Sequence, residues 1–502
     1  MKVLQTLAVV LVGLIVATGV GTCQTWQPLN NQPSFNPGTM LLLTDGTVLV
    51  HSEPNCLTCT TTDYSSWYKL TPDSNGSYAN GAWTQVASFP NGYAPLYFGS
   101  AVLPDGRVVV EGGEYNCATG SCNAVWTNQG AIYDPLKNTW APVQPPNGWT
   151  TIGDAQSVIL PNGTYMQANC CTKQQALFNP TNLTWTSIGT GKFDINDEEG
   201  WTLLPNGKVL TVDAYVFQYD ATGTNSEIYS PATATWTSAG STISQLWDSC
   251  GGADAASYEV GPAVLRPDGT VFATGANTCG PGHTAIYNSH TGTWTAGPDF
   301  PGAYGAADGP AALEPNGNVL VFTSPSRFYP PAGEFFEWNG TSLTMITSPP
   351  SALADASFVG HLLVLPTGQI LFTDFTTDVE VFTPAGTYNP AWAPTISSVP
   401  GSVARGKTYT ISGTQFNGLS QGAAYGDDFQ DATNYPLVRI VNQATGHVFY
   451  CRTHNHSTMA VATRTRKVST NFDVPAGAET GLSQLFVVAN GIPSSPYSIK
   501  VR

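Results

Sequence analysis

The segment "AIYDPLKNTW" (131–140) decides the fold of this chain, because the same ten-residue pattern returns three more times. The other copies are "ALFNPTNLTW" (176–185), "EIYSPATATW" (227–236) and "AIYNSHTGTW" (285–294). In each copy an aromatic residue precedes the tryptophan by seven positions, and Asp, Asn or Ser opens a turn between them. This pattern predicts two antiparallel strands joined by a tight hairpin.

A second module alternates with the first and occurs seven times. In "GSAVLPDGRVVV" (99–110) an apolar strand leads into a turn closed by Gly106, and a β-branched strand follows. The turn glycines of the seven copies are Gly46, Gly106, Gly163, Gly207, Gly269, Gly317 and Gly368. Seven units of four strands predict an all-β protein built on a seven-bladed β-propeller.

Both ends of the chain depart from the repeat. The last copy lacks a fourth strand of its own, whereas the segment around Trp26 has that character and precedes the first copy. We therefore predict that an N-terminal strand completes the last blade. From about Ala393 the pattern changes to period-two alternation with frequent turns, which predicts an immunoglobulin-like β-sandwich. The predicted domains are a propeller over 24–392 and a sandwich over 393–502.

Residues 1–22 have the features of a secretory signal peptide. Lys2 supplies the positive start, and an apolar stretch runs to about Val20 before small residues follow. We therefore expect a secreted, extracellular protein. Lipid attachment at Cys23 is a lesser alternative, because Thr22 is a poor residue immediately before such a cysteine.

Export explains the ten cysteines as disulfide partners. Two pairs, Cys56/Cys59 and Cys117/Cys122, are close enough in sequence to bridge single loops, although the first also has the spacing of a redox or zinc pair. Cys250 and Cys279 can join two loops. Cys170 and Cys171 either bridge each other or pair elsewhere, and Cys451 is a candidate free thiol.

The charge balance limits the partners. The formal net charge is −16, and only 10% of residues are charged. These values argue against nucleic acid and anionic membrane surfaces as partners, and they suit a neutral or cationic ligand. No apolar span long enough for a bilayer follows the N-terminal segment, so we expect no transmembrane span and a monomer.

The order of these parts resembles the galactose oxidase and glyoxal oxidase family. The resemblance rests on seven kelch-like blades before an immunoglobulin-like domain, with "YFGSAVLPDG" (97–106), "RTHNHST" (452–458) and "LFVVANGIPSSP" (485–496) as the more specific segments. It implies a copper centre held by two tyrosines and two histidines, with one tyrosine cross-linked to a cysteine. It also implies oxidation of primary alcohols or aldehydes.

The family's copper ligands carry over only in part. By resemblance Tyr97 stands at the cross-linked tyrosine, and His454 matches the histidine of the sandwich, with His456 as the alternative. Asn36 stands where the family has the cysteine.

In the last blade, Phe358 and Val359 stand where the family has a tyrosine–histidine pair. His361 could replace the missing histidine only after a shift of strand register. Copper is therefore disfavoured as the cofactor, and the cofactor stays unassigned.

One position recurs at the start of each blade, seven residues before the turn proline. It holds Tyr97, Asp154, Glu198 and Asp308 in four of the blades, and Glu259 is adjacent to it in a fifth. These residues lead into the innermost strand and are expected to face the central funnel.

Three roles stay open for Asp154, Glu198 and Asp308. They are candidate catalytic residues, serving as general acid and as base or nucleophile of a carbohydrate-processing enzyme. They are also candidate calcium ligands, since calcium prefers oxygen donors. Finally, they can cap backbone N–H groups at the ring mouth.

Loops on the same face are rich in aromatic residues, which offer flat apolar surfaces to sugar rings. The candidate substrate-binding residues are Tyr97, Trp149, Trp201, Trp247 and Tyr304. The alternative for these side chains is packing between blades.

The sequence therefore predicts a secreted galactose-oxidase-like propeller protein that binds extracellular carbohydrate or a small polyol at the funnel. Whether it also processes that ligand stays open. Two alternatives remain. One is a copper-dependent oxidase of primary alcohols or aldehydes with a rearranged copper site, and the other is a non-catalytic structural or adhesion protein.

Overall fold

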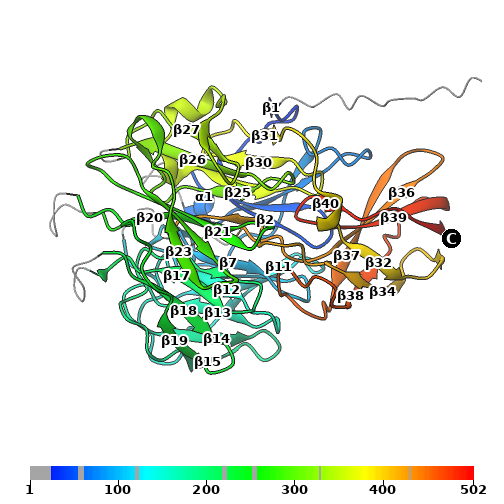
Figure 1. Cartoon of the computed structure of the whole chain (residues 1–502). Helices are drawn as coiled ribbons and strands as arrows, with labels where there is room; N and C mark the ends of the chain where they lie inside the picture. The colour runs from blue at the N-terminus through cyan, green and yellow to red at the C-terminus, as the bar shows by residue number, and fades with distance from the viewer. Residues whose placement is uncertain are drawn as a thin grey trace, which may run out of the picture.

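The computed structural model describes residues 24–54, 61–118, 122, 124–216, 223–250, 257–326, 329–428 and 431–502. The predicted signal peptide, Cys23 and the Cys56/Cys59 pair lie outside these residues. Seven antiparallel sheets form a β-propeller, so the predicted fold class is confirmed (Figure 1). Six of them have four strands, and in the sheet of blade six the four strands are joined by two short ones, β24 and β35.

The blades follow one another along the chain, each beginning with its innermost strand. Blade one comprises β2 (Pro37–Leu42), β3 (Val48–Ser52), β4 (Trp67–Thr71) and β5 (Ala82–Gln85). Blade two comprises β7 (Gly99–Val102), β8 (Val108–Glu111), β10 (Gly130–Asp134) and β11 (Thr139–Val143). Blade three comprises β12 (Ser157–Ile159), β13 (Tyr165–Ala168), β14 (Gln175–Asn179) and β15 (Thr184–Ile188). Blade four comprises β16 (Thr202–Leu203), β17 (Val209–Val212), β18 (Ser226–Ser230) and β19 (Thr235–Ser238). Blade five comprises β20 (Val260–Leu265), β21 (Thr270–Gly275), β22 (Thr284–Asn288) and β23 (Thr293–Ala296). Blade six comprises β25 (Ala311–Leu313), β26 (Val319–Pro325), β27 (Glu334–Trp338) and β28 (Leu343–Met345).

The seventh blade contains chain from both ends of the propeller. It comprises β29 (His361–Val364), β30 (Ile370–Thr373), β31 (Glu380–Thr383) and β1 (Thr25–Pro28). Strand β1 pairs antiparallel with β31, and Trp26 lies opposite Phe382. The predicted closure of the ring by an N-terminal strand is therefore confirmed.

The repeated tryptophans join neighbouring blades. The indole N–H of Trp140 in blade two donates to the carbonyl of Ala87, 3.0 Å away, in the segment that follows blade one. Trp185 makes the same bond to Gln144 at 2.8 Å, one blade further on. Trp26 donates to Thr347 at 2.9 Å, so the N-terminal strand serves as an outer strand like the others. At these three junctions the tryptophan therefore links its blade to the preceding one by a hydrogen bond.

Short elements connect the blades. They are α1 (Thr61–Ser65), β6 (Pro95–Leu96), β9 (Tyr115–Asn116), η2 (Pro301–Ala303), β24 (Tyr304–Gly305), η3 (Ser351–Ala354), η4 (Ser357–Val359) and η5 (Pro390–Trp392). None of the helices in the described ranges is both long and apolar enough to cross a bilayer.

After the propeller, one nine-stranded sheet surrounds a core of its own, which is compatible with a β-sandwich (Figure 1). Its strands are β32 (Thr395–Ser398), β33 (Ser402–Val403), β34 (Thr408–Thr414), β36 (Leu437–Asn442), β37 (Val448–His454), β38 (Val468–Asp473), β39 (Gly481–Ala489), β40 (Ile492–Pro493) and β41 (Tyr497–Val501). Ile411, Val438 and Phe472 are fully buried in that core.

The segment between β34 and β36 leaves the sandwich and enters the propeller. Its short strand β35 (Ala423–Ala424) pairs with β25, the innermost strand of blade six. Beside it, Tyr435 donates a hydrogen bond to the carbonyl of Leu42 in blade one. The second domain therefore contributes backbone and side chains near the propeller axis.

Three disulfides lie within the described residues: Cys117–Cys122, Cys170–Cys171 and Cys250–Cys279. Cys170 and Cys171 thus bridge each other, and Cys451 is a buried free cysteine.

Candidate functional site

A pocket of about 310 Å³ opens where the innermost strands meet. It is lined by Tyr97, Glu114, Tyr115, Asp154, Glu198, Ser257, Glu259, Ala307, Asp308, Tyr329, Phe358, Tyr425 and Asp427. Six of these are carboxylates, and none of the described lining residues is Lys, Arg or His. The pocket therefore has a strongly negative potential, which favours a cation, a hydrogen-bond donor or a bound proton.

Unusual backbone conformations place the side chains that lead into the innermost strands. Tyr97, Glu198 and Asp308 have φ values of 52°, 58° and 42°, in the left-handed region that non-glycine residues seldom adopt. Asp154 directly follows Gly153, which has a φ of 71°. Each left-handed residue with a side chain costs about 1–2 kcal/mol. Strain of this kind often accompanies functional sites, which makes the funnel a candidate for one.

The innermost carboxylates form the funnel triad, which we define as Glu198, Glu259 and Asp308. Each offers an oxygen within 4.8 Å of the others, from blades four, five and six. Glu259 is hydrogen-bonded to both Glu198 and Asp308. Because a carboxylate cannot donate, these contacts require protonation of at least one member.

Burial sets the proton affinities of the triad. It raises the pKa values of Glu198 and Glu259 well above the usual range, and the negative charge of Asp308 raises both further. Burial also raises the pKa of Asp308 to about 6, although its hydrogen bond to Glu259 opposes that effect. Near neutral pH the triad therefore holds protonated and ionised carboxyl groups side by side.

A second layer of carboxylates surrounds the triad. Burial raises the pKa of Glu114 to about 7 and that of Asp197 to about 6. It raises the pKa of Asp154 well above the usual range, with the charge of Glu114 as the next cause. Asp154 and Asp197 also lie within 4.8 Å of the Cys170 sulfur. Because that sulfur is in a disulfide, it offers no thiolate to a metal.

Aromatic side chains form the remaining walls of the pocket. The Tyr329 hydroxyl lies 3.1 Å from the Ser257 hydroxyl. The Tyr425 hydroxyl donates to the carbonyl of Phe358 at 2.6 Å. These contacts fix rings from three separate segments of the chain around the acidic floor.

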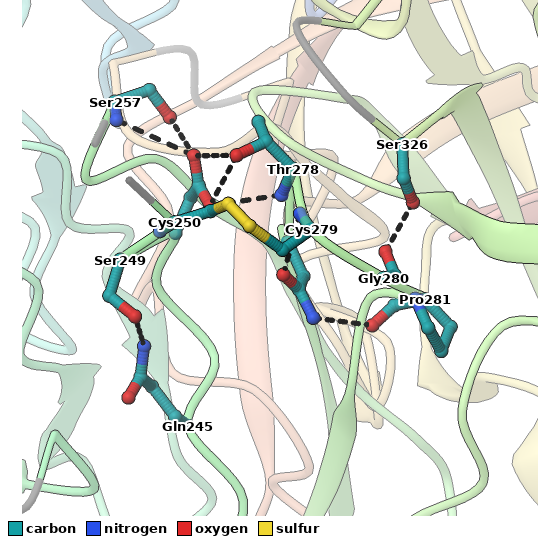
Figure 2. Close-up of a disulfide and its surroundings, with 11 residues drawn as sticks. Gln245, Ser249, Cys250, Ser257, Thr278, Cys279, Gly280, Pro281 and Ser326 are labelled. Carbon is teal, nitrogen blue, oxygen red and sulfur yellow. Dashed lines mark hydrogen bonds between the residues drawn. A yellow bond between two sulfur atoms is a disulfide. The ribbon is translucent and has the colours of Figure 1, made fainter. Parts of the chain in front are cut away.

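Blade five is braced by the Cys250–Cys279 disulfide (Figure 2). The buried Asp248 carboxylate beside it accepts hydrogen bonds from the Thr278 backbone N–H at 2.9 Å and the Ser257 hydroxyl at 3.1 Å. These bonds hold the segment that ends in Glu259, so the bridge supports one member of the funnel triad.

Several lining residues were missed by the sequence analysis. Glu114 and Tyr329 lie in loops and Tyr115 begins the short strand β9. All three are outside the repeat, so the repeated pattern gave no prediction for them. Tyr425 and Asp427 follow β35 in the segment that the sandwich sends into the propeller. The only local signal for the last two was the acidic stretch "YGDD" (425–428) in a chain with few charges.

The histidines predicted as metal ligands lie elsewhere. His454 ends β37 in the sandwich, where its Nε2 is 3.2 Å from Asp473. His456 bonds through Nδ1 to Thr470 at 2.9 Å, also within the sandwich. His361 is buried in blade seven, with Nε2 4.0 Å from the Glu53 carboxylate. None of the three lines the pocket.

Four of the five aromatic candidates are packed side chains. Trp149 contacts Ile152, Trp201 lies against Trp236, Trp247 stacks on Tyr258 and Tyr304 packs on Phe336. The packing alternative describes these four. Tyr97 lines the pocket together with the predicted catalytic residues Asp154, Glu198 and Asp308.

No protein-family model matches this chain, and no curated protein matches it in sequence. Among solved structures, a fungal alcohol oxidase of the AA5 family, in complex with copper, aligns over 95% of this chain and 99% of its own, with 15% identity and a TM-score of 0.50. This chain has the galactose-oxidase-like fold.

Two further structures align over 72% of the chain. A streptogramin B lyase aligns over 98% of its own length, with 8% identity and a TM-score of 0.47. Virginiamycin B lyase from Staphylococcus aureus aligns over 99% of its own length, with 9% identity and a TM-score of 0.44.

The pocket does not fit a galactose-oxidase-type copper centre. Four tyrosines, Tyr97, Tyr115, Tyr329 and Tyr425, line the pocket, but no imidazole is among the described lining residues. Asn36 donates to the carbonyl of Phe375 and supplies no sulfur for a cross-link. Copper(II) sites in proteins favour nitrogen donors, whereas the carboxylate oxygens of this pocket suit protons or hard cations.

Proposed function

We propose that the funnel binds a neutral carbohydrate or small polyol outside the cell and cleaves glycosidic bonds by acid–base chemistry. The observation that carries the proposal is the funnel triad, three coupled carboxyl groups at the floor of an aromatic-walled pocket. Carboxylates accept hydrogen bonds from hydroxyl groups, and the rings of Tyr97, Tyr329 and Phe358 offer faces on which a sugar can pack.

The two ends of the triad take different roles. The pKa of Glu198 is raised further above its usual range than that of Asp308, so Glu198 is the proton donor to the leaving oxygen. Asp308, with a pKa of about 6, is mostly ionised at neutral pH. It bonds to the anomeric carbon, or stabilises its positive charge, while the glycosidic bond breaks and the leaving oxygen takes the Glu198 proton. Water then adds to the anomeric carbon, releases Asp308 and returns a proton to Glu198, so the net reaction is hydrolysis. Their nearest oxygens lie within 4.8 Å of each other, so both carboxyl groups can reach one glycosidic bond.

The experiment is a screen of the full chain against chromogenic glycosides and polysaccharides between pH 5 and 7, with binding measured by calorimetry. We expect Glu198→Gln and Asp308→Asn each to lower kcat by about 100-fold or more while the far-UV spectrum is unchanged. Glu314→Gln is the matched control, because Glu314 is a buried carboxyl outside the pocket. Saccharide binding without turnover in the wild type would overturn the catalytic half alone, and absence of both would overturn the whole.

The proposed location outside the cell draws on the three disulfides, since such bonds persist in oxidising compartments. The protein acts as a monomer in this proposal, because the funnel is assembled from one chain. Light scattering of the purified protein measures its mass in solution and contradicts this part if it gives a dimer.

A further inference from the structure

A second group of titratable side chains lies away from the pocket floor, between blades three and four. We define the lysine–carboxylate cluster as Lys192, Asp194, Glu199, Asp213 and Glu227. None of the five side chains is more than 4% exposed. Lys192, Asp194 and Glu199 belong to the segment that joins β15 to β16, Asp213 follows β17, and Glu227 is in β18.

One ammonium group faces four carboxylates in this cluster. Lys192 Nζ lies 2.8 Å from Glu199 Oε1, 2.8 Å from Glu227 Oε2 and 3.6 Å from Asp213 Oδ1, and it also donates to Asp194. If all four carboxylates are ionised, Lys192 compensates one charge and three remain. Buried charge is costly unless it is paired, so the cluster needs more positive charge than the lysine supplies.

Oxygens without a hydrogen-bond donor show where that charge belongs. Within the described residues, Asp194 Oδ2 and Asp213 Oδ2 are buried and accept no hydrogen bond, although Asp194 is 0% exposed and Asp213 only 1%. Buried acceptors are normally satisfied, and each exception calls for a missing partner. Both oxygens belong to side chains that converge on the same point.

Three carboxylates of the cluster are close enough together to bind one cation. Asp194, Asp213 and Glu227 each offer an oxygen within 4.8 Å of the other two. Calcium takes about six to eight oxygen ligands in flexible geometry, so three carboxylates together with further hydroxyl and water oxygens suit it. Magnesium binds at about 2.0–2.1 Å and requires a tighter, octahedral arrangement.

The same side chains border a cavity. A cavity of about 560 Å³ is lined by Asp213 and Glu227, and the hydroxyl-bearing residues Thr224, Ser226 and Ser241 contribute further oxygens. An ion therefore has a route to the carboxylates and room for water ligands, which calcium commonly retains.

We propose that Asp194, Asp213 and Glu227 form a calcium site in blade four, with Lys192 as a fixed neighbouring cation. Calcium there compensates two of the three excess charges and satisfies the open oxygens. It also ties the segment 192–199 to the body of the blade, and that segment carries Glu198 into the funnel. The site does not depend on the chemistry proposed for the funnel.

The test uses the full chain after treatment with EDTA, titrated with calcium at pH 7.5 by calorimetry and thermal unfolding. We expect one calcium ion per chain and an increase of at least about 5 °C in Tm at saturating calcium, since a ligand that binds only the folded state stabilises it. Terbium(III) is the optical probe, because the Trp236 ring lies 5.6 Å from Lys192 Nζ and can sensitise its emission.

Variants assign the ion to this cluster. We expect Asp213→Asn to weaken calcium binding at least tenfold and to abolish terbium emission. Glu198→Gln, in the funnel, is expected to retain both signals. If Asp213→Asn does not fold, Asp194→Asn replaces it.

Two outcomes would overturn the proposal. The first is no heat and no change in Tm with calcium in the wild type, which would mean that protons alone balance the cluster. The second is calcium binding that Glu198→Gln removes and Asp213→Asn does not, which would place the ion in the funnel.

Discussion

One short segment of the chain enters two acidic clusters of opposite design. The side chains of Lys192 and Glu199 point into the lysine–carboxylate cluster, where an ammonium group lies among four carboxylates. The side chain of the neighbouring Glu198 points into the funnel triad, and no described residue that lines the pocket there carries a positive charge. The first cluster borders a cavity and contains a cation of the chain, whereas the second opens into a pocket whose described lining residues include none. The chain thus places its own cation where structure is needed and leaves the funnel charge to a ligand or a proton.

The largest effect is expected from Lys192→Met, which removes the built-in cation and leaves four buried carboxylates. Loss of one partner from a buried ion pair costs about 3–5 kcal/mol, so we expect the free energy of unfolding at pH 7.5 to fall by that amount.

Urea unfolding of calcium-free protein measures this loss. Lys137→Met is the matched control, since the Lys137–Asp134 pair is on the surface and is worth about 1 kcal/mol or less. Equal losses for the two variants would mean that burial of Lys192 adds nothing.

The next prediction removes a carboxyl group from the funnel triad, whereas the previous one removes a cation from the lysine–carboxylate cluster. Glu259→Gln replaces a buried carboxyl group, whose pKa is raised well above its usual range, by an amide that cannot ionise and that can donate to Glu198 or Asp308. We expect the free energy of unfolding at pH 7.5 to rise by about 1 kcal/mol while turnover falls, which is the usual exchange between stability and function. A loss of more than about 2 kcal/mol in the same urea assay would instead make the triad a structural element.

The free energy of unfolding should also fall as the pH rises, because carboxyl groups at the funnel have raised pKa values in the folded protein. Glu114 has a pKa near 7 in the folded protein and an ordinary value of 4.5, so the folded state holds its proton over a range in which the unfolded state has lost it. The stability that this proton confers is complete below pH 4.5 and is lost as pH rises toward 7.

Thermal unfolding between pH 4.5 and 7.5 tests this dependence. In Glu114→Gln we expect the decline in stability over that window to be smaller by about 1–2 kcal/mol, with part of the decline remaining because Asp197 and Asp308 titrate near 6. An unchanged decline would remove Glu114 from the acidic layer.

The smallest effect is expected from His454→Ala, outside both clusters. The His454–Asp473 pair is partly exposed, so the free energy of unfolding should change by less than about 1 kcal/mol. Saccharide affinity measured by calorimetry should be unchanged. A large loss of affinity would restore the sequence-based assignment of this histidine to the funnel.

The propeller could be predicted from the sequence because each blade repeats the same short sequence pattern. A hairpin turn, a buried inner strand and a tryptophan that bonds to the previous blade leave a periodic trace. Funnel residues at the repeated position, such as Asp154, Glu198 and Asp308, share that register and could be placed toward the axis without coordinates.

Contributions from outside the repeat could not be predicted. Tyr425 and Asp427 reach the pocket only because β35 pairs with β25, a contact between distant segments that has no period. The histidine pair at 454 and 456 resembled the family's motif locally, yet β37 keeps it in the sandwich. The charge balance around Lys192 was equally hidden, since Asp213 and Glu227 approach it only after strands β17 and β18 pair.

The closing strand β1 is synthesised first and used last. Its partner β31 does not exist until nearly the whole propeller has been made, and the intervening chain must be ordered before Thr25 can meet Thr383. Joining such distant segments is entropically costly and slow. A chain cut short before β31 therefore retains an open ring with an unpaired strand at each end, so completion of the circle reports that the entire propeller has been translated.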